Sequence, residues 1–265
     1  MNGVRHFLLA LQFFTRVPVT GPLAGWVGFS PAMLRASAAH FPGVGWLVGA
    51  VAAGVFCSAQ AGLPGFAGAL AAAALSTIAT VLMTGAFHED GLADVADGLG
   101  GSADRARALE IMKDSRIGAF GAIALVLALG LKVLLLGALA GQGAPTVVLA
   151  LVSAHVLSRL APLFLIRWLP YVGDENAASK SKPLADAIGN GALLVGVAWS
   201  LPAVGWLVMT QGAMRGMAPV LLCALAAWLV ARLLRRRLRG FTGDGLGATQ
   251  QVCELAIYLA LAWRA

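Results

Sequence analysis

The chain has 265 residues, of which 59% are hydrophobic and only 12% are charged, and its formal net charge is +7. Soluble domains carry about 25% charged residues, so this composition excludes an ordinary soluble protein. It indicates an all-α, polytopic integral membrane bundle. We expect a single domain over residues 1–265, because no charged block is long enough to fold separately in water.

The N-terminal segment is short and apolar. Residues 6–14 follow Arg5 and run into residues 15–18 without a small-residue cleavage site, so they do not match a signal peptide. Their length is also too short to cross a bilayer. We therefore predict a short, retained amphipathic or re-entrant helix at the N-terminus.

Apolar runs long enough to cross a membrane follow one another along the rest of the chain, each about 20 residues long. They cover residues 42–60, 64–87, 117–140, 145–166, 189–209, 217–234 and 248–263. Because the last run is short, we expect six to seven transmembrane helices. The runs are rich in Gly and Ala, which lets helices pack closely and makes a homo-oligomer a reasonable expectation.

The charged residues gather in three connections, residues 88–116, 167–188 and 235–247. Alternating spans place these connections on one side, and the positive-inside rule assigns that side to the cytoplasm of a bacterial inner membrane. The acidic residues follow the same partition, so we expect an active site that faces the cytoplasm. A transporter would rather place ionisable groups near the midplane, and it is the less favoured alternative.

The most informative motif is HEDGLADVADG at residues 88–98. Asp90, Asp94 and Asp97 are spaced i, i+4, i+7 and share one face of a helix. Clustered carboxylates suit Mg²⁺, which bridges protein carboxylates to substrate phosphates. The alternative is a solvated helix start, where acids are favoured by the helix dipole. His88 is a candidate base or ligand, or a simple interfacial histidine.

A second motif, LEIMKDSRIGAFG, covers residues 109–121. Lys113 and Arg116 are close enough to clamp phosphate oxygens together. Asp114 lies between them and either joins the metal site or pairs with a neighbouring cation. The alternative for the two cations is a juxtamembrane anchor.

The third motif, RGFTGDGLGA, covers residues 239–248. Glycines around Thr242 and Asp244 at a helix start indicate a backbone nest for anions, or simple N-capping. Gln251 lies two turns after Asp244 on the same face, and Glu254 follows it. These four residues are candidate substrate contacts.

Two further groups of cations, those inside the apolar runs and the arginines before the third motif, each have two possible roles. Arg159 lies one turn after His155 within the fourth apolar run, where it either lines the site or partners buried polar groups. Lys132 in the third run has the same two interpretations. The arginines at positions 235–237 are compatible with an anchor for anionic lipids.

The segments HEDGLADVADGLGG, ALEIMKDSRIGAFG and FTGDGLGATQQVCEL resemble, in this order, the cobalamin synthase (adenosylcobinamide-GDP ribazoletransferase) family. The resemblance implies an Mg²⁺-dependent membrane transferase that joins adenosylcobinamide-GDP to α-ribazole, or its 5′-phosphate, and releases GMP. It also implies that the partners are the lipid bilayer and other corrinoid-assembly enzymes. Nucleic acid is not expected as a partner.

On this resemblance, the three acids of the first motif hold Mg²⁺ and the pyrophosphate, and one of them accepts a proton from the attacking hydroxyl. Lys113 and Arg116 stabilise phosphate charge, and Asp244 contacts the metal or the nucleoside. A rival class is the CDP-alcohol phosphotransferases. Their motif places an Ala-Arg pair after the Asp-Gly, whereas Ala93 is followed here by Asp94.

Overall fold

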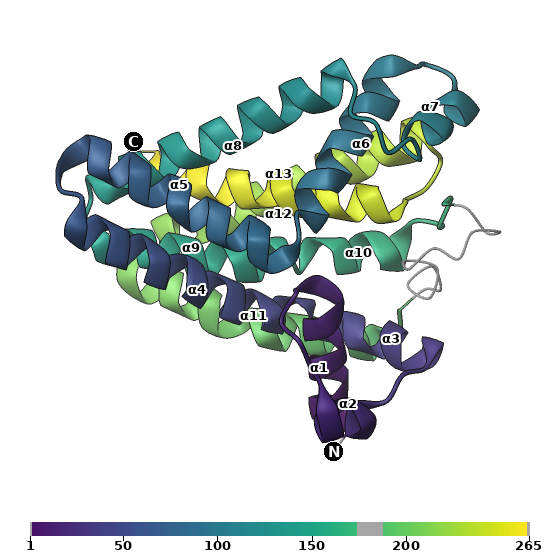
Figure 1. Cartoon of the computed structure of the whole chain (residues 1–265), viewed down its shortest axis with the longest axis horizontal. Helices are drawn as coiled ribbons and strands as arrows, with labels where there is room; N and C mark the ends of the chain where they lie inside the picture. The colour runs from purple at the N-terminus through teal and green to yellow at the C-terminus, as the bar shows by residue number, and fades with distance from the viewer. Residues whose placement is uncertain (1, 174–187, 264–265) are drawn as a thin grey trace.

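The computed structural model describes residues 2–173 and 188–263 (Figure 1). Helices make up most of this part, and it contains one isolated β-bridge between Tyr171 and Phe241. The α-helices are α1 Asn2–Phe14, α2 Gly21–Val27, α3 Pro31–Ser37, α4 Phe41–Gly62, α5 Gly65–Thr84, α6 Phe87–Gly101, α7 Arg105–Ile111, α8 Ala119–Ala140, α9 Ala144–Ser158, α10 Ala161–Trp168, α11 Asn190–Gln211, α12 Ala213–Arg237 and α13 Gly243–Ala262.

Six helical segments in the described part are long and apolar enough to cross a membrane, which agrees with the expected six to seven. They are Pro31–Gly62, Gly65–Thr84, Ala119–Ala140, Ala144–Trp168, Asn190–Gln211 and Ala213–Arg237. The seventh expected span, residues 248–263, forms most of α13. Helix α13 is not among the six, because it carries polar and acidic side chains into the interior of the bundle.

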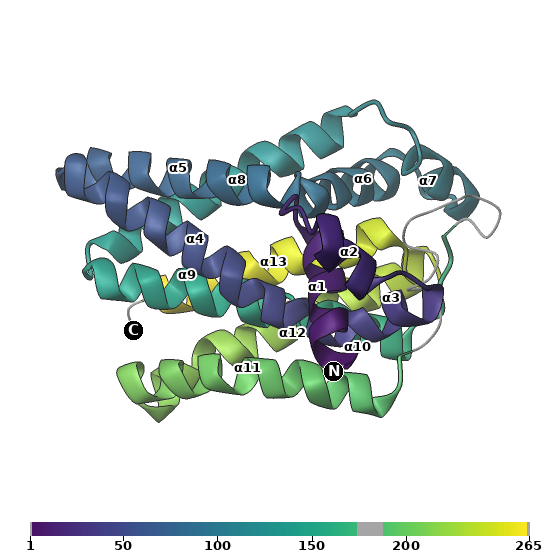
Figure 2. The same ribbon diagram turned by 60° about the horizontal axis from the view of Figure 1, so that its bottom comes forward.

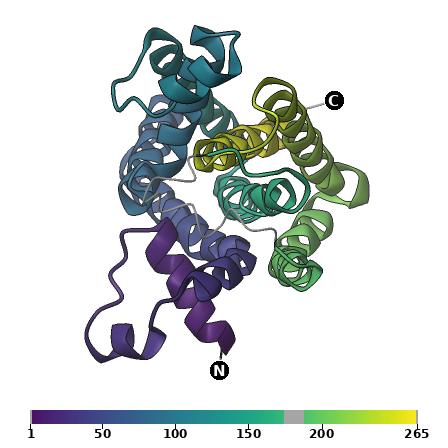
Figure 3. The same ribbon diagram turned by 90° about the vertical axis from the view of Figure 1, so that its right-hand side faces the viewer.

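The long helices run roughly parallel to the long axis of the molecule, and the described parts of the charged connections lie together at one end (Figure 1). That end holds α6, α7 and the turn between α12 and α13, whereas the C-terminus lies at the other end. Seen from the charged end, α10 and α13 occupy the centre, with α4 and α5 on one side and α11 and α12 on the other (Figure 3). The described parts of the charged connections therefore share one end of the bundle, as the alternation of the apolar runs predicted.

The helices differ from the sequence prediction in the fourth apolar run. The run 145–166 forms two helices, because Pro162 lacks the amide N–H that would bond to Ser158 and continue α9. The connection 88–116 is mostly helical, since it contains α6 and α7. Gly85 and Ala86 both adopt left-handed backbone angles (φ 68° and 58°), and they turn the chain sharply from α5 into α6.

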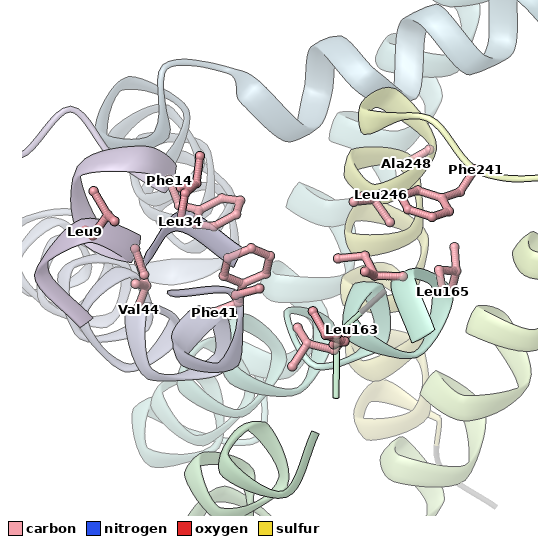
Figure 4. Packing of buried hydrophobic residues seen from close by; sticks show 14 of the residues in the cluster. Leu9, Phe14, Leu34, Phe41, Val44, Leu163, Leu165, Phe241, Leu246 and Ala248 are labelled. Atoms are coloured by element: carbon pink, nitrogen blue, oxygen red, sulfur yellow. The ribbon is translucent and has the colours of Figure 1, made fainter. Parts of the chain in front are cut away.

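The N-terminal segment is a helix, as predicted, and it lies crosswise to the long helices, packed against α3 and α4 (Figure 2). Its buried face joins a hydrophobic cluster that reaches α4, α10 and α13 (Figure 4). Phe14 meets Phe41 edge to face, with ring centroids 3.9 Å apart. This cluster fixes α1 and α4 against the helices that carry the candidate site.

Candidate active site

The first turns of α6 and α13 pack against each other through glycines. A Cβ atom on Gly91 would collide with the backbone of Asp244, and one on Gly247 would crowd the backbone of His88. Only glycine permits so close an approach of two helices. The contact brings Asp90 and Asp94 of the first motif next to Asp244 of the third, although Asp94 and Asp244 are 150 positions apart in the sequence.

The three carboxylates form an acidic cluster, which we define as Asp90, Asp94 and Asp244. Burial, and then the charges of Asp244, Asp90 and Asp97, raises the pKa of Asp94 to about 7. Burial and the charge of Asp90 raise the pKa of Asp244 to about 6. No basic side chain of the described residues forms an ion pair with any of the three. The cluster therefore holds surplus negative charge that a cation would neutralise.

The acidic cluster fits a metal ion whose coordination is completed by the substrate. Within residues 2–173 and 188–263, no group of three His, Cys, Asp or Glu side chains converges closely enough to hold a metal alone. Mg²⁺ keeps several waters and is commonly held by one or two carboxylates together with substrate phosphates. The exposed Asp90 and half-buried Asp94 offer such carboxylates.

Asp97, which the sequence grouped with the other two aspartates, is buried and points toward the start of α8. Its carboxylate accepts hydrogen bonds from the backbone N–H groups of Gly118 (2.7 Å) and Gly121 (2.8 Å). A carboxylate at a helix N-terminus satisfies unpaired donors and interacts favourably with the helix dipole. In this position Asp97 ties α8 and the preceding loop to α6.

That loop carries the second motif. Asp114 pairs with Arg116 at 2.6 Å, and the guanidinium lowers the pKa of Asp114 to about 2. Asp114 thus takes the cation-pairing role that the sequence left open. The side chains of Lys113 and Arg116 are exposed at the charged end.

Thr242 caps α13. Its hydroxyl accepts a hydrogen bond from the backbone N–H of Gly245 at 3.1 Å, as the N-capping interpretation predicted. His88 is buried, and its ring stacks on Phe14. Burial lowers the pKa of His88 well below its usual range, so the ring is neutral. It lies beside a small cavity that Arg159 and Gln250 also line.

Beneath the acidic cluster lies a buried polar network between α6, α8, α9 and α13. Glu254 is its centre: one carboxylate oxygen contacts the Lys132 ammonium at 2.7 Å and accepts the Tyr258 hydroxyl at 3.0 Å. The other oxygen accepts the Gln250 amide at 2.7 Å. Arg159 donates to the backbone carbonyl of His155 at 3.0 Å. The carboxylate of Glu254 is thereby fully hydrogen-bonded inside the bundle, whereas Arg159 Nε and His155 Nε2 have no hydrogen-bond partner among the described residues.

Three residues that the sequence assigned to substrate contact lie in this network instead of at the surface. The exposed fractions of Arg159, Gln251 and Glu254 are only 3%, 4% and 1%. Glu89, which the sequence did not single out as a site residue, is also part of this network: it is 7% exposed and accepts the Gln251 amide at 3.0 Å. Its partner comes from a distant helix, so no local pattern marked it.

The fold and the site define a polytopic membrane protein with an acidic cluster, and neighbouring exposed cations, at one end of a helical bundle. The chain belongs to the cobalamin-5-phosphate synthase family, whose model matches residues 6–262. It is 58% identical to the adenosylcobinamide-GDP ribazoletransferase of Albidiferax ferrireducens, over 98% of both chains. The proteins of the same name from Polaromonas naphthalenivorans and Leptothrix cholodnii are 56% and 48% identical, covering 99% and 98% of this chain and 99% and 95% of their own. No solved structure matches it.

Proposed function

We propose that this protein transfers the adenosylcobinamide phosphate group of adenosylcobinamide-GDP to α-ribazole or α-ribazole 5′-phosphate, releasing GMP. Relatives named for this activity align with nearly the whole chain. The observation that carries the proposal is the acidic cluster, in which α6 and α13 hold carboxylates without a counter-cation among the described residues. Such a site suits a pyrophosphate substrate that arrives with a divalent cation.

In the reaction, the acceptor's ribose hydroxyl forms a new bond to the phosphorus that carries the cobinamide group. The bond from that phosphorus to the bridging oxygen breaks, and GMP leaves with that oxygen. Asp90 and Asp94 would hold Mg²⁺, which supplies neutralisation of the pyrophosphate charge when bound. Asp244 fits the role of proton acceptor for the attacking hydroxyl, because its pKa of about 6 leaves it ionised near neutral pH and still basic.

The cations of the second motif are the candidates for phosphate binding. The hydrogen bonds from Gly118 and Gly121 to Asp97 hold the loop before α8 beside α6. Lys113 and Arg116 therefore occur on the same end of the bundle as the acidic cluster. Cations aimed at the transferring group stabilise the charge that develops on phosphate oxygens.

The proposed location is the bacterial inner membrane, with the acidic cluster facing the cytoplasm. Support comes from the arginines of α7 and of the end of α12, which share the charged end with the cluster. We also propose that further copies or other corrinoid-assembly enzymes associate with the bundle, since small residues are frequent on its helices.

The test is turnover by the purified protein in lipid vesicles with adenosylcobinamide-GDP, Mg²⁺ and each acceptor, followed as GMP release. We expect release that needs an acceptor and stops in excess EDTA. Release of CMP from CDP-alcohols, with none of GMP, would replace this proposal by the rival phosphotransferase class. Movement of corrinoid across the vesicle membrane without any turnover would indicate a transporter.

A further inference from the structure

A groove of about 920 Å³ runs along the outer surface of the bundle between α10 and α12. Its floor is apolar and includes Ala161, Leu165, Cys223 and Ala227. It lies apart from the acidic cluster, because none of Asp90, Asp94 and Asp244 lines it. The proposed reaction makes no use of this groove.

The groove exists because α12 presents small side chains toward α10. Cys223, Ala227 and Ala231 recur at a spacing of four residues, so they follow one another along a single face of the helix. Facing them, α10 begins at the break that Pro162 imposes. Small residues on one side and a helix break on the other leave room for an elongated apolar group.

Two tryptophans border the groove. Trp168 at the end of α10 is 70% exposed, and Trp228 on α12 is 53% exposed. Trp168 stacks on Phe164, with ring centroids 5.0 Å apart, so its position is fixed by packing. An exposed tryptophan at the end of a membrane helix, as Trp168 is, marks the level where lipid headgroups begin.

The end of the groove nearest the charged face is basic. Arg232, Arg235 and Arg236 line it, and none of them has an acidic partner among the described residues. The guanidinium of Arg232 lies over the Trp228 ring at 5.2 Å. Guanidinium groups bind phosphate in a bidentate manner.

Arg237, the next residue in the run, has a structural role and does not line the groove. It donates hydrogen bonds to the backbone carbonyls of Leu99 (3.1 Å) and Ser102 (2.6 Å) at the end of α6. The arginine run thus divides into one structural contact and a basic rim at the groove. The basic rim, formed by Arg232, Arg235 and Arg236, has no acidic partner among the described residues and is therefore available to an anionic ligand.

We propose that the α10–α12 groove is a binding site for one anionic phospholipid. An acyl chain lies on the apolar floor between the tryptophans, and the phosphate contacts Arg232, Arg235 and Arg236. The combination of an apolar floor with three cations at the headgroup level matches this occupant. A second copy of the chain would bring two such basic rims together without acids between them, and a neutral lipid would leave the rim charge unmatched.

The experiment measures binding of phosphatidylglycerol and phosphatidylcholine, with identical acyl chains, to the delipidated protein by native mass spectrometry. We expect one retained phosphatidylglycerol, with at least about tenfold preference over phosphatidylcholine. The triple variant Arg232→Gln/Arg235→Gln/Arg236→Gln is expected to lose this preference. The control Arg215→Gln, which removes a cation from the opposite end of α12, is expected to keep it.

A second variant, Ala227→Phe, fills the floor while leaving the arginines in place. We expect it to bind phosphatidylglycerol at least about tenfold more weakly while unfolding at the same temperature as the unchanged protein. Equal binding of both lipids, an unaffected triple variant, or displacement of the lipid by inorganic phosphate alone would overturn the proposal. So would a lipid-free dimer that the triple variant or Ala227→Phe dissociates.

Discussion

The ammonium of Lys132 in α8 lies 2.7 Å from the carboxylate of Glu254 in α13, and both side chains are almost completely buried. The hydroxyl of Tyr258 and the amide of Gln250 complete the hydrogen bonding of the carboxylate. A buried charge is tolerated only when it is paired and hydrogen-bonded. This ion pair therefore locks α13, and with it the acidic cluster at the helix start, onto α8.

Removing one partner of this ion pair is expected to leave the other charge buried and unpaired. Lys132→Met should lower the free energy of unfolding by about 3–5 kcal/mol, seen as a lower unfolding temperature in detergent. The double variant Lys132→Met/Glu254→Gln should recover part of this loss, because no ion remains inside the bundle. A single variant as stable as the unchanged protein would contradict the pairing.

Substitutions of the aspartates in the first motif should have different effects: one should lower stability and the other should lower activity. Asp97→Asn keeps one acceptor oxygen for two backbone donors, so we expect a loss of about 1–3 kcal/mol in stability. It should also raise the KM for adenosylcobinamide-GDP, because the loop with Arg116 shifts. Asp90→Asn, at an exposed position, should leave the unfolding temperature unchanged and reduce GMP release at saturating substrate. Identical effects of the two substitutions on stability would contradict a structural role for Asp97 and a catalytic role for Asp90.

The different roles of these aspartates show how much of the site could be predicted from the sequence. Spacing along α6 correctly predicted one helical face for the three aspartates. It could not show that Asp97 is taken up by backbone N–H groups of Gly118 and Gly121, which lie more than 20 residues further on. In the same way, the apolar runs predicted the spans, but only the packing of α6 against α13 shows that Gln251 meets Glu89.

The contact between α6 and α13 depends on the absence of a side chain at Gly91. Gly91→Ala should separate the two helices, lower the unfolding temperature and reduce GMP release at least about tenfold. The control is Gly54→Ala in α4, where an added Cβ meets nothing within 4 Å. We expect that substitution to be neutral or slightly stabilising, because alanine favours helix over glycine. Equal behaviour of the two variants would argue against the close contact.

The affinity for Mg²⁺ should depend on pH. In the metal-free protein the pKa of Asp94 is about 7 and that of Asp244 about 6, so both carboxyls are largely protonated below these values. Because Mg²⁺ must displace the proton of Asp94, and its charge also disfavours a proton on the neighbouring Asp244, its affinity should rise from about pH 5 to about pH 8 and then level off. Calorimetry in two buffers of different ionisation enthalpy should show proton release near pH 6. An affinity that does not change over this range would contradict the shifted pKa values.

The acidic cluster as the reaction centre is tested most directly by GMP release from adenosylcobinamide-GDP in the Asp94→Asn variant. Its matched control is Asp104→Asn at the start of α7, where Asp104 is exposed and caps the N–H of Arg107 at 2.8 Å. Asparagine caps helices as well as aspartate does, so the control should keep full turnover. We predict that Asp94→Asn unfolds at an unchanged temperature and loses at least about a hundredfold in kcat. Full turnover by Asp94→Asn in Mg²⁺ would contradict the account.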